Sequence, residues 1–454
     1  MFVFFGGLLV LALFAALIGP HFIDWSSYRQ DFEREAGRIL GQKVQVLGEA
    51  DARLLPFPSV SFDNVIVGEG QDGRPMMTIE QFSMDVELAP FLSGEVRIFD
   101  MRINNPRGTL RLSSEGELDW ALRNEKVLPG QALTLENITI TNGQALIIDE
   151  QSERQHLITD LDVKMSAKSI AGPWYMEGSG EIDGYRGDFE FQTGTQLEEN
   201  RIRLKTRLLP AALPVSVDLE GDLRIENLKP QYKGTFEVRA LEPATTPNAN
   251  GTEGKSGRHP LYARALGIFE LNNERLRIED YRLETGDQSD PYVISGQATL
   301  DTGRNPEFLL IADGQQLNLS RMGDTQDGAQ DEAQTDDPVS LDERLETLRQ
   351  LVAVTPVPQM PGRVSVSLPA VLAGNTTIRD VLMEAEPDGV FWKINRIEAK
   401  FPGRTQFLAA GQMGVGANLG FTGEVIVASN QPSGFASWLT DSVDPAIRRL
   451  DAAG

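Results

Sequence analysis

The sequence of 454 residues has no cysteine and only three histidines. Without cysteine, the chain forms no disulfide bond and offers neither a thiol nucleophile nor a thiolate metal ligand. The histidines, His21, His156 and His259, stand far apart, and no pair has metal-ligand spacing on one element. The chain also lacks a Gly-x-Ser-x-Gly elbow and a phosphate-binding glycine loop. We therefore expect no enzyme activity, no metal site and no cofactor.

Basic residues are scarce beside acidic ones. Lys plus Arg number 42 and Asp plus Glu number 66, which gives a formal net charge of -24. Nucleic-acid binding needs a basic footprint for the phosphates, so we expect no nucleic-acid partner. The same balance argues against a broad electrostatic contact with anionic lipid headgroups. The acidic run from Asp324 to Asp337 lacks the ligand spacing of a calcium loop and is interpreted as a solvated loop.

What the chain has is strand-like alternation with a recurring slip. In "LTLENITI" the apolar residues alternate, but the period shifts by one residue across Glu136 and Asn137. Such a shift should turn the later side chains to the other face of a sheet. A β-bulge cancels this turn and bends the strand. The pattern therefore predicts one bent strand with a single apolar side.

The spacing apolar-x-apolar-x-x-apolar-x-apolar recurs along the chain, for example in "VSFDNVIV", "MTIEQFSM", "VRIFDMRI" and "LRIEDYRL". Short loops between several of these segments favour antiparallel pairing. We predict a mainly β protein with a long, bent, mostly antiparallel sheet and a few short helices. An ordinary twisted antiparallel sheet, in which bulges also recur, is the alternative.

A row of strands bent at one level would curl the sheet into a trough with an apolar inside. The rival interpretation is that helices or a second sheet fill this trough as ordinary core. The inward positions of the repeats are the candidate groove residues. They are Val60, Phe62, Val65, Ile79, Phe82, Val96, Ile98, Met101, Leu135, Ile138, Ile158, Leu161, Ile278, Tyr281, Ile378 and Ile394.

The N-terminal run from Phe2 to Gly19 is uncharged and apolar. As a helix it would span about 27 Å at 1.5 Å per residue, close to the thickness of a bilayer core. A cleaved signal peptide is the alternative, but no small-x-small site precedes a permissible cut. We predict an uncleaved transmembrane anchor over residues 1–22, followed by an amphipathic helix over residues 23–42. Trp25 and Tyr28 are expected at the membrane interface.

The remaining chain divides by composition. We expect the sequence to be the N-terminal part of a longer protein. The expected order is a first groove segment at 43–241, a flexible loop at 242–260, a groove continuation at 261–322, an acidic disordered loop at 323–340, a helix at 341–352 that connects or covers, a groove continuation at 353–430 and short helices at 431–454.

Several stretches resemble the N-terminal region of AsmA-like proteins, relatives of TamB among the bridge-like lipid-transfer proteins. They are "IDWSSYR", "VLGEADARLLPFPSVSFDNVIVG", "LAPFLSGEVRIFDMRINNP" and "EGELDW", between Ile23 and Trp120. Leu133 to Glu150 is similar to the family's next strand pair, with a turn at Asn142 and Gly143, and Phe401 to Met413 is a weaker echo. Family members often have a Thr-Gly-Arg turn, where this chain has Leu40-Gly41-Gln42-Lys43.

The resemblance implies an inner-membrane anchor, a periplasmic body and an apolar β-groove that moves phospholipid toward the outer membrane. Its partners would then be phospholipids, the inner membrane and envelope or outer-membrane components. The alternative is a scaffold for outer-membrane biogenesis that recruits partners by strand addition at an open β-edge. Charging the groove at Ile98 and Ile138 is expected to remove lipid contact from a conduit and leave a scaffold unaffected.

Overall fold

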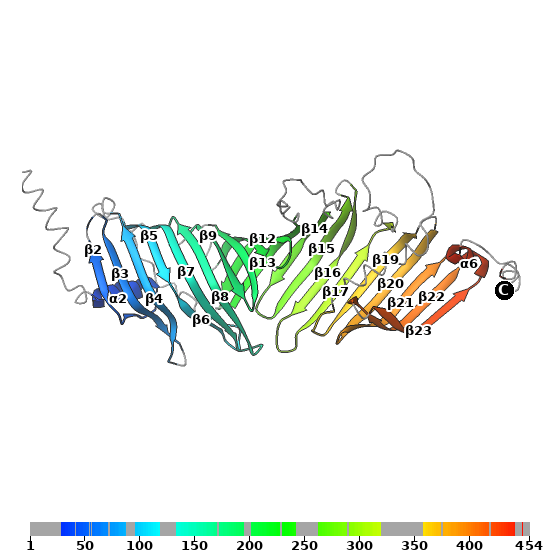
Figure 1. Ribbon diagram of the computed structural model, residues 1–454, viewed down its shortest axis with the longest axis horizontal. Helices are drawn as coiled ribbons and strands as arrows, with labels where there is room; N and C mark the ends of the chain where they lie inside the picture. Colours follow the sequence, from blue (N-terminus) through cyan, green and yellow to red (C-terminus); the bar gives the residue numbers. More distant parts are fainter. Residues whose placement is uncertain are drawn as a thin grey trace, which may run out of the picture. The chain divides into compact units, whose positions relative to one another are not determined.

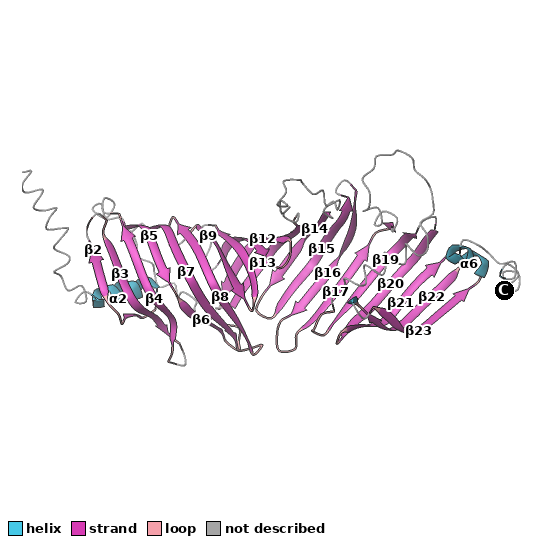
Figure 2. Cartoon of the chain, in the orientation of Figure 1, coloured by secondary structure: helices cyan, strands magenta, loops and turns pink. Residues whose placement is uncertain are grey.

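The computed structural model describes most of the chain outside the first 28 residues. The described residues are 29–40, 42–53, 55, 57–70, 73–87, 96–118, 133–169, 172–194, 201–227, 229–241, 262–287, 290–318, 357–373, 376–416, 419–440 and 447. Most of them lie in strands, and the rest form helix α2 (Arg29–Leu40), helix α6 (Pro432–Thr440) and the turns and short loops between elements (Figure 2). The strands form a large, mostly antiparallel sheet, which confirms the predicted mainly β class.

The chain divides into two compact units, Met1–Gly234 and Thr235–Gly454. The boundary falls inside strand β13 (Lys229–Ala240). The strands of unit 1 before β13 are β1 (Val44–Val46), β2 (Ala50–Arg53), β3 (Ser59–Glu69), β4 (Pro75–Val86), β5 (Val96–Asn104), β6 (Arg107–Leu112), β7 (Leu133–Asp149), β8 (Arg154–Ala167), β9 (Trp174–Ile182), β10 (Tyr185–Thr193), β11 (Arg201–Pro210) and β12 (Val215–Glu226).

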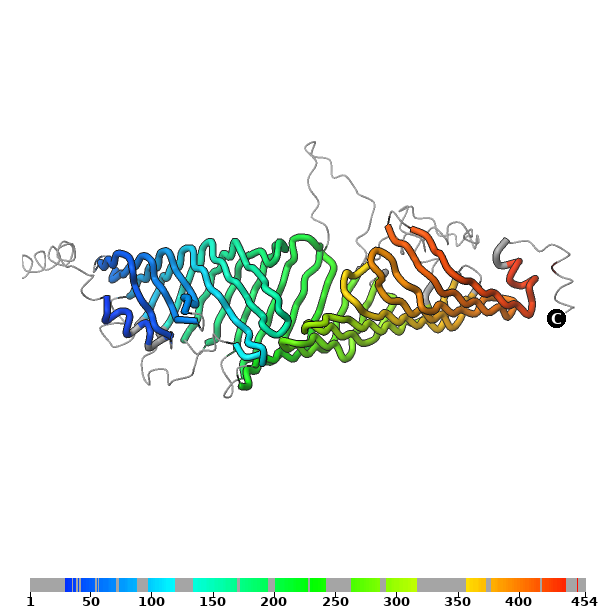
Figure 3. The backbone as a smooth tube through the Cα atoms, turned by 90° about the horizontal axis from the view of Figure 1, so that it is seen from below, coloured from blue at the N-terminus to red at the C-terminus, as the bar shows by residue number. Residues whose placement is uncertain are grey.

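Unit 1 is a meander with one parallel step. Strands β7 to β12 pair in chain order, each antiparallel to the next. Figure 3 shows them following one another from cyan to green. Strands β5 and β6 follow one another between β4 and β7. Both are antiparallel to β4 and parallel to β7. The sequence analysis did not predict this parallel step, which needs the long connection between Leu112 and Leu133.

The predicted bulges are present. The register changes between Leu135 and Ile138 of β7, opposite β8, where the sequence slips across Glu136 and Asn137. Strands β3 and β4 bend together, since Phe62 pairs with Phe82 and Val65 with Ile79, so their common register is kept. Each bulge returns the apolar side chains to one face, as the spacing requires.

The prediction of a turn at Asn142 and Gly143 is wrong. Strand β7 runs without interruption from Leu133 to Asp149. Asn142 has a φ of 54°, and the register to β8 shifts between Ile140 and Gly143. The left-handed conformation that Asn tolerates serves here as a second bulge inside one long strand instead of a hairpin turn.

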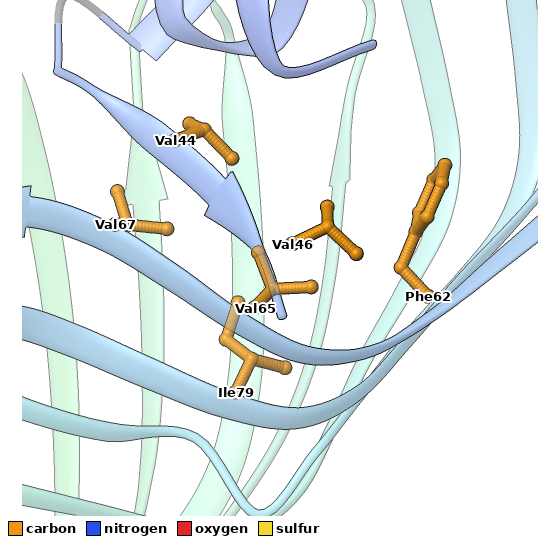
Figure 4. Close-up of a cluster of buried hydrophobic side chains, with 6 residues drawn as sticks. All are labelled: Val44, Val46, Phe62, Val65, Val67 and Ile79. Carbon is orange, nitrogen blue, oxygen red and sulfur yellow. The ribbon is translucent and has the colours of Figure 1, made fainter. Parts of the chain in front are cut away.

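Helix α2 covers the apolar side of the first strands. The ring of Phe32 stacks on Phe62 with 3.9 Å between centroids, and Ala36 packs against the same cluster. The buried members of this cluster come from β1, β3 and β4, and Figure 4 shows them on the concave side of the curved ribbons; they are Val44, Val46, Phe62, Val65, Val67 and Ile79. A second buried cluster joins Ile98 of β5 to Leu135 and Ile138 of β7.

Unit 2 repeats the plan with its own parallel step. Its strands after β13 are β14 (Tyr262–Leu271), β15 (Arg275–Asp287), β16 (Asp290–Asp301), β17 (Glu307–Gly314), β18 (Leu317–Asn318), β19 (Gly362–Ala373), β20 (Thr376–Asp388), β21 (Phe391–Phe401), β22 (Thr405–Gly414) and β23 (Gly420–Ser429). Strands β17 and β18 pair in parallel with β19, and the other pairs are antiparallel.

Predicted bulges also occur in unit 2. The register shifts between Ile278 and Tyr281 of β15, opposite β16, and between Ile394 and Ile397 of β21, opposite β22. The buried core of this unit lies around β17 and β19 to β22, where Ala385, Trp392 and Ile394 are buried. Helix α6 packs at the far end, with Phe435 edge-on to Phe401 of β21 at 5.9 Å.

Several sequence predictions fall on residues outside the described part. They include the anchor at residues 1–22, Trp25 and Tyr28, the loops at 242–260 and 323–340, and the helix at 341–352. Neither of the helices that the structure describes is long and apolar enough to cross a bilayer. Helix α2 lies within the range predicted for the amphipathic helix.

The bulge at Asn142 generates a stability prediction. The change Asn142→Val places a β-branched residue at positive φ and removes the Asn142 side-chain hydrogen bond to Asn105. We expect it to lower the free energy of unfolding by about 1–3 kcal/mol. Urea unfolding followed by circular dichroism measures the effect.

Two control variants separate backbone strain from other causes. Asn142→Gly accepts the positive φ and should be closer to wild type than Asn142→Val. Thr141→Val, at the exposed neighbouring position, should stay within about 0.5 kcal/mol of wild type. Equal stability of the two valine variants would contradict the assignment of strain to Asn142.

Candidate functional site

The most extended feature of unit 1 is a set of apolar rows that cross the strands. Cross-strand pairing aligns side chains of successive strands, and the two-residue period keeps them on one face. One row consists of Ile138, Met165, Met176, Phe191, Thr206 and Leu219. The next consists of Ile140, Val163, Gly178, Phe189, Leu208 and Val217. We call the face that carries these rows the apolar face and the opposite one the outer face.

The apolar rows are buried at their start and half-exposed further on. Ile138 is 4% exposed, because it belongs to the buried cluster between β5 and β7. On β10 and β11 the large apolar side chains Phe189, Phe191 and Leu208 are only partly buried. No buried hydrophobic cluster lies on β10 to β12 among the residues that the structure describes. This part of the apolar face is therefore accessible to another apolar group.

The outer face of the same strands carries acidic and basic side chains that form ion pairs. Arg203 and Lys205 of β11 flank Glu220 of β12, with N to O distances of 2.8 and 3.2 Å. Arg207 contacts Asp218 at 2.7 Å. Hydrogen bonds from Arg203 and Lys205 hold the pKa of Glu220 below its ordinary value. Exposed pairs of this kind contribute about 0–1 kcal/mol each, so their main effect is to keep this face hydrated.

Unit 2 has its own apolar rows. The longest aligned row runs from β14 to β23 and consists of Phe269, Ile278, Ala298, Leu310, Val364, Ala385, Ile394, Gly411 and Gly423. Its first and seventh members, Phe269 and Ile394, are 3% and 2% exposed, while Ile278 and Leu310 are more accessible. Within unit 2, the apolar face defined by this row thus continues through the parallel step between β17 and β19.

Tyrosines of unit 2 lie across glycines on this face. Tyr281 of β15 donates its hydroxyl hydrogen bond to the carbonyl oxygen of Ile311 on β17 at 2.9 Å, and a Cβ on Gly296 of the intervening strand would lie 3.1 Å from that hydroxyl oxygen. Tyr292 likewise reaches the carbonyl oxygen of Gln315 at 3.1 Å. Burial raises the pKa of both phenols. The hydroxyls are satisfied by backbone, so the rings present apolar surface.

A line of polar side chains marks the bend of unit 1. Asn105 Nδ2 donates to Glu80 Oε2 at 2.7 Å, and Asn142 Nδ2 donates to Asn105 Oδ1 at 2.6 Å. Glu80 and Asn105 border a shallow cavity of about 500 Å³, which is lined by Asp63, Asn64, Glu80, Gln81, Asn104, Asn105 and Thr141. Because several of these groups bond to one another, we assign the line a structural role in holding neighbouring bends at one level.

The described residues give no support for a metal centre. No group of three or more His, Asp or Glu side chains within the described ranges is placed to hold a metal ion. On β8, His156 Nδ1 lies 2.6 Å from Oδ2 of Asp183 in the turn that follows β9. That hydrogen bond, with one from the Leu157 amide, lowers the pKa of Asp183. The pair fastens the turn between β9 and β10.

The predicted groove residues fall into two groups. Seven are largely buried by the protein's own packing: Phe62, Val65, Ile79, Ile98, Leu135, Ile138 and Ile394. Eight are partly buried: Val60, Phe82, Met101, Ile158, Leu161, Ile278, Tyr281 and Ile378. The side chain of Val96 lies outside the described part, although its backbone pairs with Leu133. Ile98 and Ile138 are thus poor positions for a groove charge, because a carboxylate there would disrupt a packed cluster.

The sequence analysis missed the accessible apolar residues of β9 to β12. Met176, Phe189, Phe191 and Leu208 follow a plain two-residue alternation without the slip, as in "YRGDFEFQT". The slipped spacing does not include them. Simple alternation of large apolar and charged residues was the signal that could have identified them.

No curated protein and no solved structure matches the chain. A family model described as the AsmA family matches residues 1–206, a range that contains α2 and the strands from β1 to β10. This range includes the stretches that carried the resemblance in the sequence, from Ile23 to Glu150. Over residues 1–206 the chain is therefore AsmA-like.

Proposed function

We propose that this protein is anchored in the bacterial inner membrane and conducts phospholipid acyl chains through the periplasm along the apolar face of its sheet. Membership of the AsmA family and a large β-sheet fit a bridge-like lipid-transfer role in general. In this proposal the sheet is a trough, the outer face is hydrated, and the protein supports the lipid balance of the outer membrane without being an enzyme.

The observation that carries the proposal is the accessible stretch of the apolar face on β9 to β12. Phe189 and Phe191 stand 5.2 Å apart between ring centroids, in rows that continue to Leu208, Val217 and Leu219. A contiguous apolar surface that the protein leaves uncovered often marks a binding site. A row of aligned side chains gives a narrow, extended surface, which matches the shape of an acyl chain.

The chemistry of this surface favours movement over capture. Ligand pockets that fix one molecule combine apolar walls with a few converging polar groups. The rows on β9 to β12 contain one buried hydroxyl, that of Thr206, and are otherwise apolar or glycine. Since each position resembles the next, an acyl chain would gain little by staying at one of them. In this proposal the apolar face does not set the direction of lipid movement, which another factor supplies.

The alternating faces of β10 give a direct test. A photo-crosslinking amino acid at Phe191 should label co-purified phospholipid, because this side chain lies on the apolar face. The same amino acid at Gln192, one residue later on the exposed outer face, is the matched control and should label none. Protein is irradiated in membranes and the adduct is identified by mass spectrometry. Equal labelling at the two positions, or labelling at Gln192 alone, would sink the proposal.

A charge on the accessible rows gives a second test. We expect Phe191→Glu to reduce phospholipid bound to detergent-free protein by about tenfold or more, since a carboxylate among acyl chains costs more than about 1.4 kcal/mol. The fold should persist, because Phe191 is only partly buried. Gln192→Glu adds the same charge to the outer face and should leave the bound lipid unchanged. Lipid is quantified by mass spectrometry, and circular dichroism checks the fold; an unchanged lipid content in folded Phe191→Glu would contradict a conduit.

The alternative, a scaffold that recruits partners by strand addition, has one observation in its favour. Strand β23 presents an edge that no strand of the described residues pairs with. A conduit and an interaction edge are compatible in one protein, because they use the face and the border of the sheet respectively.

A further inference from the structure

Strand β23 is the most exposed strand of unit 2. It pairs with β22 over ten consecutive residue pairs, from Thr405 with Ser429 to Gly414 with Gly420, without a register shift. Nine of its ten residues are exposed, and Val425, Ile426 and Val427 are 51%, 58% and 48% exposed. Figure 1 shows β23 as the last strand of this unit, with α6 at its end. A regular apolar edge of this length is a template for pairing with another strand.

The first strands of unit 1 show how an edge is protected. There the border consists of two short strands, β1 and β2, which pair with different parts of β3. The Glu33 carboxylate of α2 accepts a hydrogen bond from the Val46 amide at 2.7 Å. Arg29 of the same helix donates to the Gly48 carbonyl at 2.9 Å. Interruption and cover by a helix are the usual protections against edge pairing.

Strand β23 has none of these protections. Its sequence, "GFTGEVIVAS", contains no Lys, Arg or Pro, and the pairing with β22 contains no bulge. The helix that follows turns to the opposite side of β22, since the Gln431 amide bonds to the Gly403 carbonyl at 2.9 Å and Phe435 packs on Phe401 of β21. The described residues after β23 therefore leave its second edge open.

The single charge on β23 indicates what the edge would accept. Glu424 lies opposite Ala410 of β22 and has no ion-pair partner among the described residues. Elsewhere in unit 2 the outer face carries ion pairs between neighbouring strands, such as Arg264 with Glu237 at 2.5 Å and Lys400 with Asp380 at 2.7 Å. A strand added to β23 would complete this pattern if it placed a basic residue opposite Glu424.

We propose that the open edge of β23 binds an extended segment of another protein as an added antiparallel strand. The segment carries apolar residues on one side, which lengthen the rows ending at Phe421, Val425 and Val427, and a Lys or Arg on the other side opposite Glu424. Main-chain hydrogen bonds supply most of the affinity, and the charge pair selects the register. This interaction does not depend on lipid.

A second copy of this chain fits the edge less well. Antiparallel self-pairing about Glu424 would set the two carboxylates opposite each other, and pairing about Val425 would set Glu424 opposite Ile426. Neither arrangement supplies a cation. The net charge of -24 also opposes the approach of two copies and favours a basic partner.

The test uses a synthetic ten-residue peptide of alternating Val and Thr, capped at both ends, with one Lys at a central Thr position. Its binding to the full chain is measured by fluorescence polarisation, beside a peptide with Glu in place of Lys. Wild type should bind the Lys peptide about threefold to fivefold more tightly, the size of a cross-strand charge pair. Glu424→Lys should reverse the preference, and Glu69→Lys, the same change at an exposed end of β3, should keep it.

Backbone methylation shows whether the peptide adds as a strand. One peptide is N-methylated at the odd positions and another at the even positions. Only the set whose N–H groups face β23 should lose binding, by about tenfold or more, because those groups make the ladder hydrogen bonds. Equal loss in both sets, no binding of either unmethylated peptide, or no reversal by Glu424→Lys would overturn the proposal.

Sedimentation of the full chain tests whether a second copy of this chain occupies the edge of β23. A monomer at the peptide-binding concentrations is the expected result. A dimer that Ile426→Lys dissociates would mean that a second copy occupies the edge, which overturns the assignment to another protein. The measurements contain no lipid, so their failure would leave the conduit proposal standing.

Discussion

The structure depends on one constraint, the need to keep a two-residue side-chain period in phase while each strand bends. A bend made by a bulge adds one residue, and without it every later side chain would face the wrong side. Glu136 and Asn137 in β7 and Glu279 and Asp280 in β15 provide this extra residue. Because neighbouring strands bulge at matching levels, as Phe62–Val65 and Ile79–Phe82 do, apolar rows stay continuous while the sheet bends.

Continuity of the rows explains the distribution of burial. A single-layer sheet leaves its apolar face to solvent unless another segment covers it. Helix α2 covers the start of unit 1 through Phe32, and the result is a packed cluster around Phe62. On β10 and β11 Phe191 and Leu208 are left half-exposed. Full burial of such a side chain is worth about 1.5–3 kcal/mol, so this part of the face retains free energy that an apolar ligand can use.

The sequence predicted the fold because its decisive signals are local. The slipped spacing identified the bulges at Glu136–Asn137 and Glu279–Asp280, since a bulge needs only neighbouring residues. It misplaced a turn at Asn142 because positive φ serves turns and bulges alike. It could not separate buried Ile98 from half-exposed Met101, because burial depends on which distant segment lies above each row. The parallel partner of β5 was unpredictable for the same reason.

In both units, buried apolar side chains lie at the place where two neighbouring strands are parallel. In unit 1 the buried cluster of Ile98 and Leu135 lies at the parallel step from β5 to β7, and in unit 2 Phe308 and Val364 pack at the step from β17 to β19. A parallel step requires the chain to return along the whole strand. Val357, just before β19, packs against the apolar cluster of unit 2 and shows that the end of this connection lies over the apolar face. Antiparallel pairs are buried where another segment covers them, as α2 covers β3 and β4, and are partly exposed where none of the described segments does, as on β9 and β10. A parallel step is therefore one source of cover for the apolar face, and a packed helix is another.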